Sequence, residues 1–171
     1  DDIDLLQMVA NQAAIAIENA RLPKEEIEKQ KIEEELTMAR RIQQGLLPKE
    51  SPKISGLDIS GISIPATEVG GDYYDFIKLD DHRLLVVVGD VSGKGMSAAL
   101  YMAKIQGMIQ FASAVYSSPK DILIEVNRKI YDGIERKSFI TMIIALFELP
   151  AKKVTICRAA HNPALMASIG Q

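Results

Sequence analysis

Apolar residues recur at three- and four-residue steps through the first part of the chain. From Ile3 to Leu22 they mark one face of an amphipathic helix, and this spacing predicts a helix that packs on another surface. Pro23 is expected to break or kink the helix. Residues 24–35 are dense in Lys and Glu, which predicts a solvated face.

A second apolar spacing runs through residues 32–46. Its steps of four, three, three and four residues approach a heptad at Ile32, Leu36, Ala39, Ile42 and Leu46. This spacing favours a short, imperfect coiled coil and a homodimer through the N-terminal helices. Packing of this helix on its own domain is the alternative. Gly45 and Pro48 are expected to end the helix.

Further along, the apolar period changes to two. Residues 57–64 are expected to form a strand with a bulge at Ser60 and Gly61. Residues 73–79 and 84–88 have the pattern of two more strands, and the polar turn between them predicts an antiparallel hairpin.

The rest of the chain predicts two helices followed by two strands. The glycine-rich segment 89–95 leads into a helix over 96–114, and a second helix begins at Ser118. Apolar runs at 139–149 and 154–159 predict central strands. Strands, then helices, then strands indicate an α+β layered domain and not a doubly wound parallel sheet.

Composition narrows the class of protein. The 171 residues allow one domain with an appendage, and the net charge of -3 provides no basic field for nucleic acid. Cys157 is the only cysteine, which excludes an intrachain disulfide and zinc sites of four cysteines or of two cysteines and two histidines. A reducing, cytoplasmic location is therefore expected. The sequence has no apolar run of roughly 18 residues, so no membrane span is predicted.

Two Gly-Asp pairs carry the candidate chemistry. Asp72 follows Gly70 and Gly71, Asp90 follows Gly89, and each acid lies at the end of a predicted neighbouring strand. If these strands pair, the two carboxylates converge, and a cation between them offsets their repulsion. Mg²⁺ or Mn²⁺ fits such oxygen ligands. Either pair alone is more typical of a simple turn, whereas the two together favour a site.

The second half of the candidate site is the loop that follows Asp90. Backbone amides of residues 92–95 precede a helix and favour an anion, and Lys94 adds positive charge. The predicted phosphate or substrate loop comprises Gly71, Ser92, Gly93, Lys94 and Gly95. The glycine spacing fits neither a Walker A loop nor a dinucleotide fingerprint.

Two further polar residues leave alternatives open. His161 is a possible general acid, but its neighbours Asn162 and Pro163 favour a structural turn between strands. Asp75 is a companion of Asp72 at a metal, a solvated residue, or a residue that supports the metal ligands without touching the metal.

Five segments in order resemble the SpoIIE/RsbU-like branch of the PPM, or protein phosphatase 2C-like, family. They are Ala39 to Pro48, Val69 to Phe76, Gly89 to Leu100, Phe139 to Met142 and Ala160 to Ala164. Residues 1–22 resemble the closing helix of a GAF sensor domain. The expected organisation is therefore a GAF-like terminal helix at 1–22, a helical linker at 23–47 and the first part of a phosphatase domain at 48–171.

The resemblance implies an α-β-β-α sandwich with two Mn²⁺ or Mg²⁺ ions and hydrolysis of phosphoserine or phosphothreonine. Asp72 and Asp90 match the family's catalytic metal-ligating aspartates, and Val91 matches a position whose backbone carbonyl is a ligand. It implies as partners a phosphorylated anti-sigma-factor antagonist and an upstream sensor domain in the same chain.

The chain departs from the family pattern at its two ends. Further metal aspartates of the family come after the His161 segment, and the sequence stops at Gln171. The chain also starts at Asp1 in the middle of a predicted helix. We therefore expect a fragment with a half-built metal site and little activity of its own. A phosphatase-like interaction module without catalysis is the alternative.

Overall fold

The structure, a computed structural model, describes residues 2–65 and 68–167, and the chain divides after Ala39 into two units. Helix α1 (Asp2–Leu46) forms the first unit and contributes its last turns to the second. Across the described ranges, no helix combines the length and apolarity that a membrane span requires.

Helix α1 is continuous, so the expected break at Pro23 is wrong. The proline cannot donate to the carbonyl of Asn19, but the turns around it are rich in strong helix formers. Arg21 also pairs with Glu18 at 2.8 Å and, across the proline, with Glu25 at 3.3 Å.

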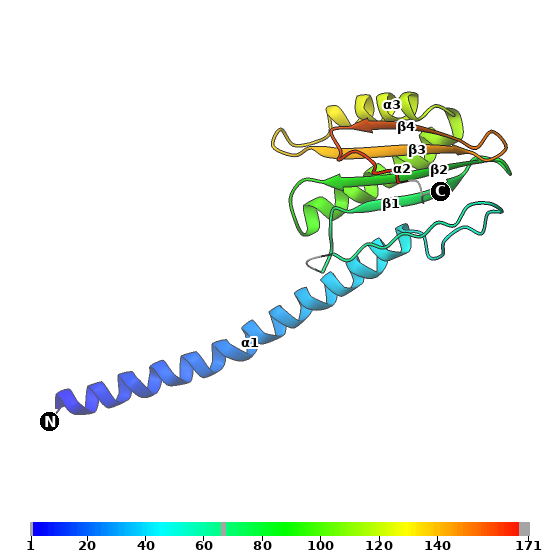
Figure 1. Cartoon of the computed structure of the whole chain (residues 1–171). Coiled ribbons are helices and arrows are strands. Elements are labelled where there is room, and N and C mark those ends of the chain that lie inside the picture. Colours follow the sequence, from blue (N-terminus) through cyan, green and yellow to red (C-terminus); the bar gives the residue numbers. More distant parts are fainter. Residues whose placement is uncertain (1, 66–67, 168–171) are drawn as a thin grey trace. The chain divides into compact units, whose positions relative to one another are not determined.

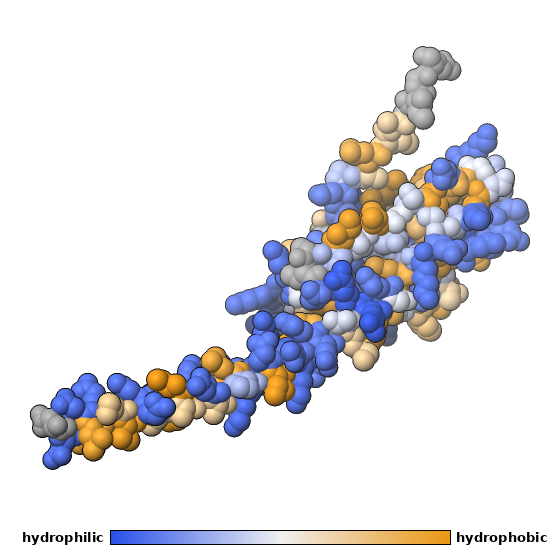
Figure 2. Space-filling view, turned by 90° about the horizontal axis from the view of Figure 1, so that it is seen from below, coloured by the Kyte–Doolittle hydropathy of each residue, from blue (hydrophilic) through white to orange (hydrophobic). Residues whose placement is uncertain are grey.

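The apolar face predicted for the start of α1 is exposed in the part of the chain that the structure describes. Ile3, Leu6 and Ile17 are each 69% exposed, and no residue of α1 is buried. Figure 2 shows apolar side chains at the surface along this helix. The dimer and the GAF-like assignment of residues 1–22 stay predictions.

The second unit is built on one antiparallel sheet. Its strands are β1 (Tyr73–Lys78), β2 (Arg83–Val91), β3 (Ile140–Glu148) and β4 (Lys153–Ala159), in the order β1-β2-β3-β4. The predicted hairpins and the α+β class are confirmed (Figure 1). Residues 2–65 and 68–167 form this single sheet and not the two stacked sheets of a full sandwich.

Two helices cover one face of the sheet. They are α2 (Met96–Val115) and α3 (Pro119–Tyr131), and the Ser118 hydroxyl caps α3 by accepting from the Asp121 amide. Fully buried side chains between helices and sheet include Leu85, Val87, Met102, Ile109, Ile122 and Ile144. This closed core makes the sheet a rigid support, and its other face carries the site described below.

The strand expected at residues 57–64 is wrong. Leu57 makes one isolated bridge to Ile54, and residues 58–65 have no ladder. The segment instead crosses the outer face of β1, where a Cβ on Gly61 would lie 2.7 Å from the ring of Tyr74 and 3.2 Å from that of Phe76. Alternation alone predicted a strand, but residues 58–65 pack on the face of β1 and not along its edge, so they make no ladder with it.

A buried carboxylate joins β1 to α2. Asp75 is 6% exposed and accepts hydrogen bonds from the Tyr73 hydroxyl at 3.0 Å, from Gln110 Nε2 at 3.2 Å and from the Phe76 amide at 2.8 Å. It lies on the helix side of the sheet, opposite to Asp72, since side chains alternate along a strand. Asp75 is therefore neither solvated nor a companion of Asp72.

The Tyr73–Asp75 contact generates a stability prediction. Burial, reinforced by the Asp75 carboxylate, raises the pKa of the Tyr73 hydroxyl far above its usual range. Tyr73→Phe leaves a buried carboxylate oxygen with one donor fewer, so we expect a loss of about 1 to 3 kcal/mol in urea unfolding at neutral pH. Above about pH 10 the loss should shrink, because ionisation of the unfolded tyrosine destabilises only the wild type.

The matched control is Tyr131→Phe, since the Tyr131 side chain is 74% exposed. Equal effects of the two substitutions would contradict the role of the Tyr73 hydroxyl.

Candidate active site

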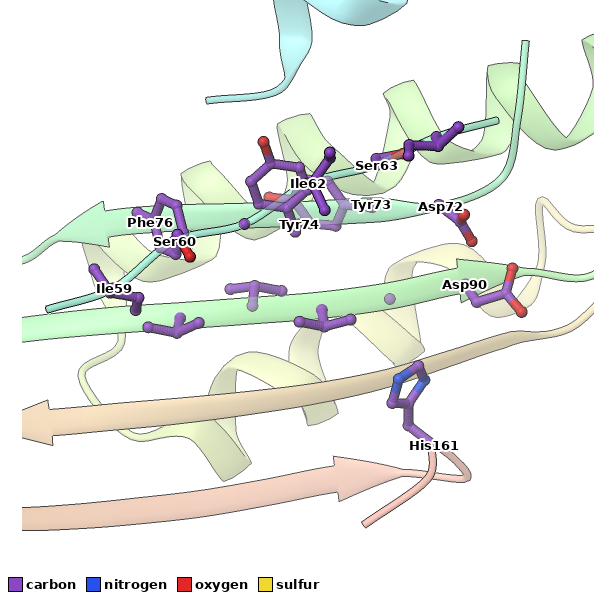
Figure 3. A pocket seen from close by; sticks show the side chains of 16 residues that line it. Ile59, Ser60, Ile62, Ser63, Asp72, Tyr73, Tyr74, Phe76, Asp90 and His161 are labelled. Atoms are coloured by element: carbon purple, nitrogen blue, oxygen red, sulfur yellow. The ribbon is translucent and has the colours of Figure 1, made fainter. Parts of the chain in front are cut away.

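The strand register brings the two predicted aspartates together. Tyr73 pairs with Gly89, and the Val91 amide donates to the Gly71 carbonyl at 3.3 Å, so Asp72 lies opposite Asp90. Directly opposed side chains have Cβ atoms about 4.5 to 5.5 Å apart. Figure 3 shows both carboxylates at the same end of β1 and β2.

Both carboxylates line the same two hollows on the outer face. The larger, of about 460 Å³, runs along the sheet under residues 59–64 and also includes His161. The smaller, of about 160 Å³, also includes Gly93, Lys94 and Gly95. Asp72 and Asp90 are exposed to solvent, so they are accessible to a cation and to a substrate.

A close backbone approach keeps the two strand ends together. A Cβ built on Gly71 would lie 2.5 Å from the carbonyl oxygen of Val91 and 3.3 Å from the side chain of Ala98. Only glycine fits this position without displacement. The Val91 carbonyl is therefore held next to the segment that carries Asp72, while the Val91 side chain is buried.

The glycine loop between β2 and α2 has the conformation that its sequence requires. Gly93 has φ 99° and Gly95 has φ 73°, which L side chains rarely adopt. Gly95 precedes the first residue of α2, so the free amides of the helix start lie beside the smaller hollow.

The predicted loop residues have different positions. Gly71, Gly93, Lys94 and Gly95 line the smaller hollow with the aspartates. Ser92 instead joins the start of β3: its hydroxyl accepts from the Phe139 amide at 2.8 Å, and its amide donates to the Phe139 carbonyl at 2.9 Å.

The end of α1 contacts the segment that leads into Asp72. The contact is made by Gln43, a residue that sequence reasoning missed. Its side-chain amide donates to the Gly70 carbonyl at 2.6 Å and accepts from the Gly70 amide at 3.0 Å. Arg40 pairs with Glu68 at 3.0 Å in the same region. Gly70 is two residues before Asp72, so the last turns of α1 hold the backbone that leads into the site. Apolar spacing carries no signal for such a contact.

Two more polar residues, Thr141 and His161, lie next to Asp90 on the side of β3. Thr141 pairs with Asp90 across β2 and β3, and its Oγ1 lies 2.7 Å from His161 Nδ1. His161 also lines the larger hollow. Sequence reasoning singled out His161 but not Thr141.

The donor set fits a hard divalent cation. Two carboxylates and one backbone carbonyl are oxygen ligands of the kind that Mg²⁺ and Mn²⁺ prefer. Residues 2–65 and 68–167 hold no cluster of three or more His, Cys, Asp or Glu side chains suited to a metal. Asp72, Asp90 and the Val91 carbonyl are oxygen groups of this kind, and they lie together at the outer end of the sheet.

Comparison with known proteins identifies the family to which the chain is similar. Residues 80–170 match the family model of stage II sporulation protein E, SpoIIE. The chain is 34% identical over 134 residues to phosphoserine phosphatase RsbU of Bacillus subtilis, covering 78% of this chain and 40% of the relative. Phosphoserine phosphatase RsbP of the same organism is 27% identical over 136 residues, covering 77% and 33%.

Two solved structures resemble the chain. The RsbU and RsbW domains of Rv1364c from Mycobacterium tuberculosis match with a TM-score of 0.52 at 26% identity, covering 60% of this chain and 28% of that one. The SiaA-PP2C domain of Pseudomonas aeruginosa matches with a TM-score of 0.66 at 22% identity, covering 77% and 54%. The second likeness shows the fold.

Fold and family together define an α+β domain of the protein phosphatase 2C type. The chain belongs to the SpoIIE family, which confirms the resemblance to the SpoIIE/RsbU-like branch. It spans less than half the length of the curated relatives that it matches, 40% of RsbU and 33% of RsbP.

The close approach at Gly71 generates a testable prediction. Gly71→Ala forces a methyl group against the Val91 carbonyl, so we expect a loss of about 1 to 3 kcal/mol of stability in chemical unfolding. Gly107→Ala is the matched control, because a Cβ there meets nothing within 4 Å and lies in a helix. That substitution should stabilise by up to about 1 kcal/mol. A neutral Gly71→Ala would show that the two strand ends separate freely.

Proposed function

We propose that the protein is a metal-dependent serine/threonine phosphoprotein phosphatase. The observation that carries this proposal is the position of Asp72 opposite Asp90, beside the Val91 carbonyl and the glycine loop. Membership of the SpoIIE family supports the same activity. Two relatives of the chain are named phosphoserine phosphatases, RsbU and RsbP.

Asp72, Asp90 and the Val91 carbonyl would hold Mn²⁺ or Mg²⁺, with two ions in the complete domain. When bound, such ions supply an activated water and neutralise the charge of the phosphate ester during in-line hydrolysis. No protein nucleophile is required. The described residues bring two carboxylates, Asp72 and Asp90, to the smaller hollow, so we propose that residues 1–171 bind metal weakly and have little activity by themselves.

The glycine loop would hold the substrate phosphate. Gly93 and Gly95 line the smaller hollow at positive φ, and the helix start that follows them favours negative charge. Lys94 adds a flexible cation at the same edge. These groups would orient the phosphate against the aspartate pair.

We propose that the substrate is a phosphorylated anti-sigma-factor antagonist in a bacterial partner-switching pathway. The similarity to phosphoserine phosphatases RsbU and RsbP supports this class. The joint presence of RsbU and RsbW domains in one similar structure also supports it. The phosphoserine or phosphothreonine would enter the outer hollow, which the helix-covered face does not obstruct.

We also propose that the helix controls the site. An upstream sensor domain and dimerisation through α1 would act on the last turns of the helix, where Gln43 holds Gly70 through two hydrogen bonds. Exposed Ile32 and Ile42, at 53% and 62%, are available for a helical partner.

The metal-site proposal is tested by Asp72→Asn and Asp90→Asn in a protein that carries the complete domain. Turnover of a phosphoserine protein with Mn²⁺ should fall more than about a hundredfold, because each change removes a carboxylate charge from the cations. Thermal unfolding should stay close to wild type, since both side chains are exposed.

The control is Asp81→Asn, which alters an exposed acid in the β1–β2 turn that pairs with Lys78. Residues 1–171 are assayed in parallel, and turnover equal to that of the complete domain would refute their expected inactivity. Full activity of both aspartate variants would contradict the proposed metal site. A wild type without activity that still assembles would favour the interaction module.

The control by the helix is tested by Gln43→Ala. Loss of both side-chain hydrogen bonds should speed hydrogen exchange of the Gly70 amide by about tenfold and lower phosphatase turnover. Gln44→Ala, one position along and exposed, should change neither quantity. Unchanged protection of the Gly70 amide in the Gln43 variant would show that the contact does not hold the loop.

A further inference from the structure

His161 is held in place by the chain reversal that follows β4. Ala160 has φ 53°, a left-handed conformation that costs a non-glycine residue energy, and it bridges to Met142 in parallel. Arg158 donates to the His161 carbonyl at 2.9 Å. A simple turn between strands does not need a backbone that is fixed at so many points.

The same reversal places the imidazole ring on the active face of the sheet. Its Nδ1 lies 2.7 Å from Thr141 Oγ1, and Thr141 is the register partner of Asp90. In Figure 3 the ring extends over β3 toward Asp90. The outer ends of β1, β2 and β3 thus carry a row of Asp72, Asp90 and Thr141, with His161 beside the last.

A phosphate bound beside this row needs hydrogen-bond donors, which the two aspartates cannot supply. A phosphate monoester brings acceptor oxygens and negative charge, and carboxylates do not donate to such oxygens. Lys94 and the loop amides lie around the smaller hollow. The larger hollow shares both aspartates, and there His161 offers a ring nitrogen.

We propose that His161 is a substrate-binding residue and Thr141 its positioning residue. The Thr141 hydroxyl donates to Nδ1, which keeps the ring proton on Nε2, and Nε2–H donates to an oxygen of the phosphoserine or phosphothreonine phosphate. The proposal rests on the proposed function. It assigns the histidine to the binding of substrate and not to the metal.

The kinetic test uses His161→Leu and His161→Gln in the protein with the complete, metal-loaded domain. His161→Leu should raise KM for a phosphoserine substrate by about tenfold with little change in kcat, because one charge-assisted hydrogen bond is lost. His161→Gln keeps an N–H donor and should restore most of the affinity. His82→Leu, which alters the other histidine, in the exposed β1–β2 turn, should be neutral.

An unchanged KM in His161→Leu overturns the proposal. So does a parallel loss of thermal stability and activity that His161→Gln does not repair, since that pattern indicates a structural role. A higher Mn²⁺ requirement at unchanged substrate affinity also overturns it, because it indicates a metal ligand.

A spectroscopic test does not depend on turnover. With two histidines in the chain, ¹⁵N NMR of the rings resolves each of them. His161 should carry its proton on Nε2, Thr141→Val should abolish this preference, and Thr141→Ser should retain it. Addition of phosphoserine with Mg²⁺ should shift the His161 signals and leave those of His82 in place.

A proton on Nδ1 of His161, or equal shifts of both histidines, contradicts the proposal. If the wild type binds phosphoserine at His161 but hydrolyses no phosphoprotein, the proposed function fails while the binding role stands. If the wild type is active and His161→Leu is unaffected, only the binding role fails.

Discussion

The outer end of the sheet is defined by the pairing of two strand ends that each carry an outward-facing carboxylate. Asp72 and Asp90 are brought together by a register that the hydrogen bond between Val91 and Gly71 extends beyond β1. Such a pair is costly without positive charge nearby. In the proposed function the Val91 carbonyl would add a third oxygen for a cation, and the loop amides, Lys94 and His161 would add donors for an anion. The arrangement suits a cation and a phosphate together.

The helix-covered face of the sheet contributes to stability, and the outer face carries the candidate site. Asp75 is three residues from Asp72, but it points to the helices, where Tyr73 and Gln110 satisfy its oxygens. Asp72 points outward and is exposed. The buried network fixes β1 against α2, and this support lets the outward side chains keep a defined geometry. One residue type thus has two roles, set by the alternation of the strand.

The contact between Gln43 and Gly70 makes the start of the acidic loop depend on the last turns of α1. A residue whose backbone N–H and C=O are both hydrogen-bonded to one side chain has little freedom. A shift of the helix end therefore changes the backbone two residues before Asp72. The proposed control by the linker requires no long path through the core, since the helix meets the loop directly.

The sequence by itself determined the local elements and the class of domain. The hairpins, α2, α3 and the end of α1 follow from apolar periods, from Ser118 as a cap and from glycines at positive φ, because these signals act between residues close in the chain. Pro23 and residues 57–64 were mispredicted, since local rules do not include what flanks a proline or whether a segment packs on the face or along the edge of a sheet.

Only the tertiary structure decided which polar residues meet. Gln43 and Gly70 are 27 positions apart, and Thr141 and His161 are 20 apart. The buried role of Asp75 became clear only from its position on the helix side of the sheet. Such contacts depend on register and packing, which apolar spacing does not encode. The five ordered motifs indicated the aspartate pair and the glycine loop from sequence, whereas the contacts of Gln43 and Thr141 became visible only in the fold.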